Sequence, residues 1–202
     1  SLRSMSKEIF TAIEGGSNNA DSEDDAFAAI AAGILAQRMG DRSIAPEIMQ
    51  RLNKRQDLLK TPPLDALFVV LRANDLRLSG EPAAAIELLK PLINGSEPFQ
   101  AHVALLDSYA AVGSKQKALE EARWLIRSRG RAYAEPGCAW CQQSLNVTDT
   151  TLAHLRAAEL LMHANQSNDA RRELLLFDKS WATGSLPDYL RVRRESLLGT
   201  FN

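Results

Sequence analysis

The 202-residue sequence has no long apolar run, almost no net charge and only two cysteines. Its most apolar stretch, residues 26–36, is shorter than the roughly 18 residues of a transmembrane helix, so we expect a soluble chain without membrane insertion. The formal net charge is −1, which excludes a global field that would recruit nucleic acid or an anionic membrane. No targeting signal is recognisable, so the sequence predicts a cytoplasmic protein.

The residue patterns of common catalytic and cofactor sites are also missing. Gly15 and Gly16 lack the lysine and the spacing of a phosphate-binding loop. The neighbouring carboxylates Glu120 and Glu121 would point about 100° apart on a helix and would not converge. No serine or cysteine has a nearby motif that would supply a base. We therefore predict that the protein is not an enzyme and has no cofactor.

The two cysteines, Cys138 and Cys141, lie three residues apart. Such a pair can form a disulfide, act as a redox pair or supply half of a zinc site. A tetrahedral zinc needs two further ligands, and the spacing of His154 and His163 fits no common zinc pattern, so we predict no metal site. A local structural role is the first expectation for the thiols, and a disulfide or redox sensing is the alternative.

One helical pattern recurs along the chain. It begins with an alanine that is followed by apolar residues four and seven positions later, and it occurs at Ala45, Ala85, Ala118 and Ala170. After Ala85, for example, these residues are Leu89 and Leu92. Small, large and large residues at this spacing form one face of a helix, and the small residue lets a neighbouring backbone come close. Because no segment alternates as a strand does, the fold class is predicted to be all-α.

Glycine and proline divide this pattern into helical pairs. We expect an N-terminal helix and joint over residues 1–20, followed by one helical-repeat domain over residues 21–202. Residues 131–147 show no sustained period and are predicted to form an irregular insertion, after which a helix begins at Thr148 or Asp149. The expected pairs and the final capping helix cover about residues 22–60, 63–94, 97–130, 149–182 and 186–198. The capping helix would have a polar outer face formed by Arg191, Arg193, Arg194 and Glu195.

This organisation resembles the tetratricopeptide repeat family, whose unit is a helix–turn–helix of about 34 residues. The similarity is best over residues 99–130, where the packing and turn positions are taken by Leu106, Tyr109, Gly113 and Ala118. In the pair at residues 149–182, Asn165 replaces the turn glycine, and the tryptophan typical of the family's first helix is absent throughout. The resemblance implies an α-solenoid of stacked antiparallel helix pairs, an architecture that binds other chains more often than it catalyses reactions.

In that family the ligand lies along one face of each first helix. The resemblance therefore implies a peptide-binding groove formed by Leu67, Val70, Asn74, Arg77, Gln100, Val103, Asp107, Leu152, Leu155, Glu159 and His163. Aliphatic and polar side chains together suit an extended segment or a helix lying in a groove. Val70 stands where some relatives carry the lysine that grips a C-terminal carboxylate, so we do not expect that kind of clamp. Alternatively, several of these side chains only pack against the neighbouring pair.

These observations predict a protein-protein interaction or scaffold module that binds a protein or peptide, or associates with its own copy. A second, weaker similarity leads to an alternative. Residues 129–135 and 145–153 resemble the C-terminal helical-repeat portion of bacterial signalling proteins that carry a cyclase or winged-helix module. That resemblance implies a regulatory or sensor domain of a larger protein, and the cysteine pair Cys138 and Cys141 would make such a domain responsive to redox state.

Overall fold

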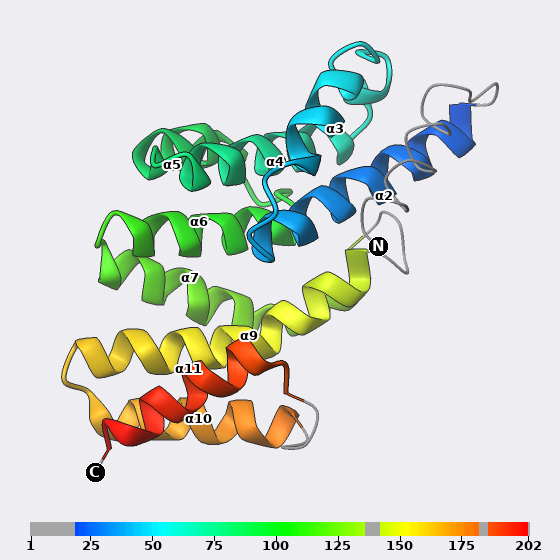
Figure 1. Ribbon diagram of the computed structural model, residues 1–202. Helices are drawn as coiled ribbons and strands as arrows, with labels where there is room; N and C mark the ends of the chain where they lie inside the picture. The colour runs from blue at the N-terminus through cyan, green and yellow to red at the C-terminus, as the bar shows by residue number, and fades with distance from the viewer. Residues whose placement is uncertain (1–18, 136–141, 182–185, 202) are drawn as a thin grey trace.

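The computed structural model describes residues 19–135, 142–181 and 186–201, and all regular structure in these ranges is helical (Figure 1). They contain ten α-helices, α2 Asn19–Arg38, α3 Ile44–Leu52, α4 Leu64–Leu78, α5 Pro82–Leu89, α6 Phe99–Ala111, α7 Lys115–Arg127, α8 Arg129–Ala134, α9 Gln142–His163, α10 Ser167–Ser180 and α11 Asp188–Gly199. Two short 3₁₀ helices lie at Leu58–Lys60 and Lys90–Leu92. The predicted all-α class is confirmed. None of the described helices combines the length and the apolar character that crossing a bilayer requires.

Four antiparallel pairs, α2–α3, α4–α5, α6–α7 and α9–α10, use the same turn between their two helices. The turn residues Gly40, Gly80, Gly113 and Asn165 all have positive φ, with values of 78°, 89°, 75° and 59°. In each turn the next residue donates its N–H to the carbonyl five positions earlier, as Gln166 does to Leu161 at 2.9 Å. This left-handed cap favours glycine and accepts asparagine, which explains the replacement at Asn165.

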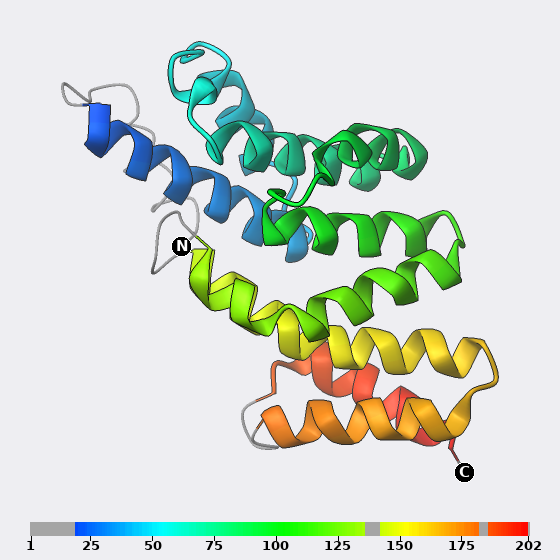
Figure 2. The ribbon, with the colours of Figure 1, turned by 180° about the vertical axis from the view of Figure 1, so that it is seen from behind.

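The recurring alanines Ala45, Ala85, Ala118 and Ala170 are all fully buried, which confirms their predicted place at close helix contacts. The apolar side chains around them form three hydrophobic clusters that follow one another along the chain. The first joins α2 to α6, the second joins α6 to α10, and the third joins α9, α10 and α11. Figures 1 and 2 show the same succession of helices from the blue end to the red end.

The predicted insertion at residues 131–147 is wrong at both ends. Helix α8 covers residues 129–134, and α9 begins at Gln142 instead of at Thr148 or Asp149. The early part of α9 buries Gln142, Asn146 and Asp149, which lie four and three residues apart on one helix face. Because these buried side chains are polar, a search for apolar periodicity does not detect the helix.

Two further boundaries differ from the prediction. The second helix of the first pair ends at Leu52, and the chain then turns so that Leu58 enters the first cluster. Asn53 follows that helix end, and asparagine is a poorer helix former than the residues before it. Of the predicted N-terminal helix and joint, only residues 19 and 20 are described, and both belong to α2. Cys138 and Cys141 lie outside the described residues, so their roles stay predictions.

A polar cluster holds the beginning of α6 against α7 and α8. The imidazole of His102 stacks on the Trp124 indole with 3.4 Å between ring centroids, and its Nδ1 lies 2.6 Å from Glu121 Oε2. Arg131 in α8 reaches Glu97, with 3.2 Å between Nη1 and Oε1. An equivalent imidazole–carboxylate contact recurs in the α9–α10 pair, where His154 and Glu173 are also 19 residues apart. These histidines therefore join the two helices of a pair.

Glu97 gives the fold a defined dependence on acid. Burial by itself would raise the pKa of its carboxyl, but N–H groups that include those of Asn94 and Gly95, together with His102, lower the pKa to about 2. A carboxyl with a lowered folded-state pKa stabilises the protein above its ordinary pKa of 4.5, and this contribution is lost as the pH falls towards 2. The shift corresponds to about 3 kcal/mol.

We therefore expect Glu97→Gln to lower the free energy of unfolding at pH 6 by about 3 kcal/mol, and to differ progressively less from the wild type below pH 4.5. Urea unfolding followed by circular dichroism at several pH values measures this difference. Glu120→Gln makes the same change of charge at an exposed position of α7 and is the matched control. A constant difference between Glu97→Gln and the wild type across this pH range would contradict the expectation.

Candidate functional site

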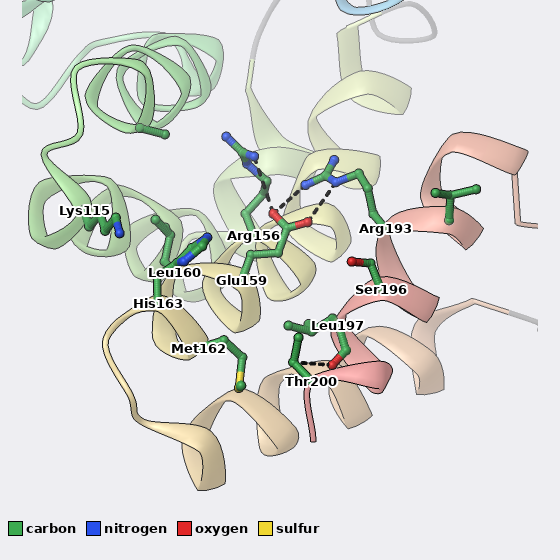
Figure 3. A pocket seen from close by; sticks show the side chains of 12 residues that line it. Lys115, Arg156, Glu159, Leu160, Met162, His163, Arg193, Ser196, Leu197 and Thr200 are labelled. Atoms are coloured by element: carbon green, nitrogen blue, oxygen red, sulfur yellow. Dashed lines mark hydrogen bonds and ion pairs between the residues drawn. The ribbon is translucent and has the colours of Figure 1, made fainter. Parts of the chain in front are cut away.

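Two adjoining hollows lie where α9 contacts α7 closely but meets α6 only weakly. The central hollow has a volume of about 310 Å³ and takes its lining from α2, α4, α6, α7, α9 and α11. The C-terminal hollow has a volume of about 620 Å³ and lies between the end of α6, the start of α7, α9 and α11 (Figure 3). Arg156 and Arg193 line both hollows, so the two form one continuous surface.

The structure brings six of the eleven predicted groove residues to these hollows. The central hollow is lined by Arg77, Val103, Asp107 and Leu152, and the C-terminal hollow by Glu159 and His163. They come from three helices, α4, α6 and α9, each of which is the first helix of its pair. The part of the prediction that placed the groove on the first helices therefore selected side chains that share one surface.

The other five predicted residues do not line either hollow. Leu67 and Val70 are fully buried in the first hydrophobic cluster, and Leu155 is fully buried in the third. Asn74 and Gln100 are also buried. We therefore correct the prediction at these five positions, because their side chains are buried inside the protein and do not face a ligand. The buried stripe of each first helix is wide enough to pack against two neighbouring helices.

Gln100 belongs to a buried polar network beside the central hollow. Its side-chain amide donates to Asn146 Oδ1 at 2.7 Å and to Asp149 Oδ2 at 2.8 Å. Arg38 at the end of α2 donates to both carboxylate oxygens of Asp149, at 2.7 and 2.6 Å, and to Gln100 Oε1. Asn146 in turn donates to Glu135, whose carboxyl pKa is raised by burial. The network joins α2, α6 and α9, and its central acceptor is Asp149, one of the two residues at which this helix was expected to begin.

A chain of alternating charges crosses the surface of the hollows from α4 to α11. Asp107 lies 4.0 Å from Arg77 and 2.9 Å from Arg156. Glu159 lies 3.5 Å from Arg156 and accepts two hydrogen bonds from Arg193, at 2.8 and 2.7 Å (Figure 3). Burial opposes the charge of Arg193, but Glu159 outweighs this effect and raises its pKa. Two carboxylates expected to contact a ligand are therefore bound by arginines of the same chain.

Sequence reasoning missed part of this surface. Arg193 was expected on the polar outer face of a capping helix, but it points to α9, and Tyr189 and Leu190 of α11 line the central hollow. Arg156 has one local signal, its spacing of three residues from Glu159 on the same helix face. That residues of α11 line the same hollow as residues of α4 and α6 has no local signal, because these helices are far apart in the sequence.

The described residues contain no group of three or more histidine, cysteine, aspartate or glutamate side chains placed to hold a metal ion. The hollows instead present guanidinium groups and carboxylates beside aliphatic side chains, which can bind charged and apolar parts of another chain. The chain matches no family model, no curated protein and no solved structure. The resemblance to tetratricopeptide repeat proteins and to bacterial signalling proteins therefore stays a prediction.

Proposed function

We propose that this chain is a protein-interaction module, an α-solenoid of stacked helix pairs that binds a peptide or an adjacent domain in its two hollows. The observation that carries this proposal is the continuous surface formed by side chains of successive first helices and of α11. The three hydrophobic clusters support the solenoid arrangement, because they follow one another along the chain, the third joining α9 and α10 to α11, instead of surrounding a single centre.

The chemistry of the surface favours a peptide over a small metabolite. Val103, Leu106 and Leu152 line the central hollow next to its charged residues. On α11, two large side chains at the hollows remain largely exposed, Tyr189 at 62% and Val192 at 61%. Exposed tyrosine and aliphatic side chains next to arginine are typical of protein contact surfaces. A partner that covers them would remove apolar area from water, which stabilises the complex.

Selection of short random peptides displayed on phage against the whole chain tests this proposal. We expect enriched peptides whose synthetic, fluorescein-labelled forms bind the wild type and bind the double variant Tyr189→Ala, Val192→Ser about tenfold more weakly, since contact tyrosines are common binding hot spots. Tyr133→Ala is the matched control, because Tyr133 is 60% exposed and lines neither hollow. No enrichment, or equal binding by the double variant, would overturn the proposal.

A further inference from the structure

We infer that Arg77 is the anion-recognising residue of the central hollow and that the bound peptide presents there an aspartate or glutamate next to an aliphatic residue. This inference rests on the proposed function and names the chemistry of the partner. It follows from the arrangement of the four guanidinium groups that line the hollow, those of Arg38, Arg77, Arg156 and Arg193.

Three of the four guanidinium groups are neutralised by a carboxylate in direct contact. Arg38 is bound to Asp149 at 2.6 Å, Arg156 to Asp107 at 2.9 Å and Arg193 to Glu159 at 2.7 Å. Each of these carboxylates accepts a hydrogen bond from its arginine. Three negative carboxylates are therefore bound to four positive guanidinium groups. One positive charge is left over, and it belongs to the fourth guanidinium.

Arg77 is that fourth group, and its hydrogen-bonding capacity is unused. Its nearest carboxylate is Asp107 at 4.0 Å, beyond hydrogen-bond distance and already held by Arg156. Within the described part of the chain, the side chain of Arg77 donates no hydrogen bond, and its Nε is buried without an acceptor. The side chain is only 19% exposed. A partly buried guanidinium without acceptors is unfavourable, so a ligand that supplies acceptor oxygens to its η nitrogens gains more than it would at an exposed arginine.

The charge of the hollow selects a carboxylate over a phosphate. The surplus of one positive charge matches one carboxylate, whereas a phosphate carries close to two negative charges at neutral pH. A second negative charge would also meet Asp107, whose carboxylate lies 4.0 Å from Arg77. A carboxylate on a peptide side chain is therefore the anion that fits best.

The wall next to Arg77 supplies the second part of the recognition. It contains aliphatic side chains from four helices, Leu78, Val103, Leu106, Leu152 and Leu190. An aliphatic residue adjacent to the acidic one would bury its side chain here. The volume of about 310 Å³ lies at the lower end of ligand-binding pockets and accommodates a short segment of a peptide.

Four peptides and four proteins, the wild type and three variants, test the inference. The probes are one peptide enriched on the wild type, its Glu→Gln or Asp→Asn form, a form with phosphoserine at the acidic position, and a form with an amidated C-terminus. The proteins are the wild type, Arg77→Gln, Arg77→Lys and the control Arg72→Gln. Arg72 lies on the same helix but is exposed and lines neither hollow. Thermal unfolding by circular dichroism verifies the fold of each variant, and fluorescence polarisation gives the Kd.

We expect the amide peptide, in which Gln or Asn replaces the acidic residue, to bind the wild-type protein about tenfold more weakly than the acidic peptide does. The reason is that a charge-assisted hydrogen bond is lost. Arg77→Gln should bind the acidic peptide about tenfold more weakly and should no longer distinguish it from the amide peptide. Arg77→Lys should restore part of the preference, Arg72→Gln should bind as the wild type does, and the amidated C-terminus should not matter.

The inference is overturned if the enriched peptides lack acidic residues, if Arg77→Gln still prefers the acidic peptide, or if phosphoserine binds more tightly than the carboxylate. An effect confined to the amidated peptide would also overturn it, because the recognised anion would then be the chain terminus. In all of these cases peptide binding itself persists, so the proposed function stands. A failure to enrich any peptide would remove the proposed function as well.

Discussion

Asp149→Ala is expected to lower the free energy of unfolding by about 3–5 kcal/mol, because it leaves a largely buried arginine without its counter-ion. In the folded chain the carboxylate of Asp149 accepts two hydrogen bonds from Arg38 and one from Gln100. Its side chain is 5% exposed, so water cannot easily replace these bonds. Urea unfolding followed by circular dichroism measures the loss.

Asp178→Ala is the matched control for this change. Asp178 also accepts two hydrogen bonds from one arginine, Arg194, but its side chain is 24% exposed, and such a pair contributes about 1 kcal/mol or less. The double variant Arg38→Met, Asp149→Leu removes both charges and should recover much of the loss. An equal loss for Asp149→Ala and Asp178→Ala would show that burial adds nothing to the Arg38–Asp149 pair.

The second large effect is expected at Phe177. Phe177→Ala should lower the free energy of unfolding by about 3–5 kcal/mol, which is typical of a phenylalanine removed from a core. Its side chain is fully buried in the third cluster, where it packs with residues that include Leu190 and Leu197 of α11. Because α11 loses this packing, amide hydrogen exchange should speed up more in α11 than in α4 or α6. The change would reach the site, since α11 borders both hollows.

Leu175→Ala on the same helix is the control, because Leu175 is 54% exposed and its truncation should change the free energy by less than about 0.5 kcal/mol. Both variants are compared by urea unfolding at the same pH. If hydrogen exchange in α11 stays at the wild-type rate while the total stability falls, then α11 is held by contacts other than the third cluster.

Local chemistry explains which parts of the fold the sequence predicts. A positive φ strongly favours glycine or asparagine, so the turns at Gly80, Gly113 and Asn165 can be recognised from single residues. The buried alanines follow from apolar spacing on one helix face. The beginning of α9 could not be predicted in this way, because Asn146 and Asp149 pack through hydrogen bonds and give no apolar signal.

The candidate site was only partly predictable for a different reason. The resemblance to tetratricopeptide repeats assigns Leu67, Val70 and Arg77 to one face of α4, and Asp107 to the corresponding face of α6, but it does not determine which part of each face the neighbouring helices cover. The structure turns Leu67 and Val70 into the core and leaves Arg77 and Asp107 at the hollow. Contacts between distant segments, such as that between Glu159 and Arg193 of α11, also lie beyond any local pattern.

The pairing of Arg38 with Asp149 joins residues 111 positions apart and ties α2 directly to α9. Arrays in which each unit touches only its neighbours can open from one end, one unit at a time. Here the first pair cannot separate without also disturbing the fourth. Force applied to α2 in a single-molecule pulling experiment would therefore be transmitted to α9, past the α4–α5 and α6–α7 pairs. The chain would then unfold in a single event.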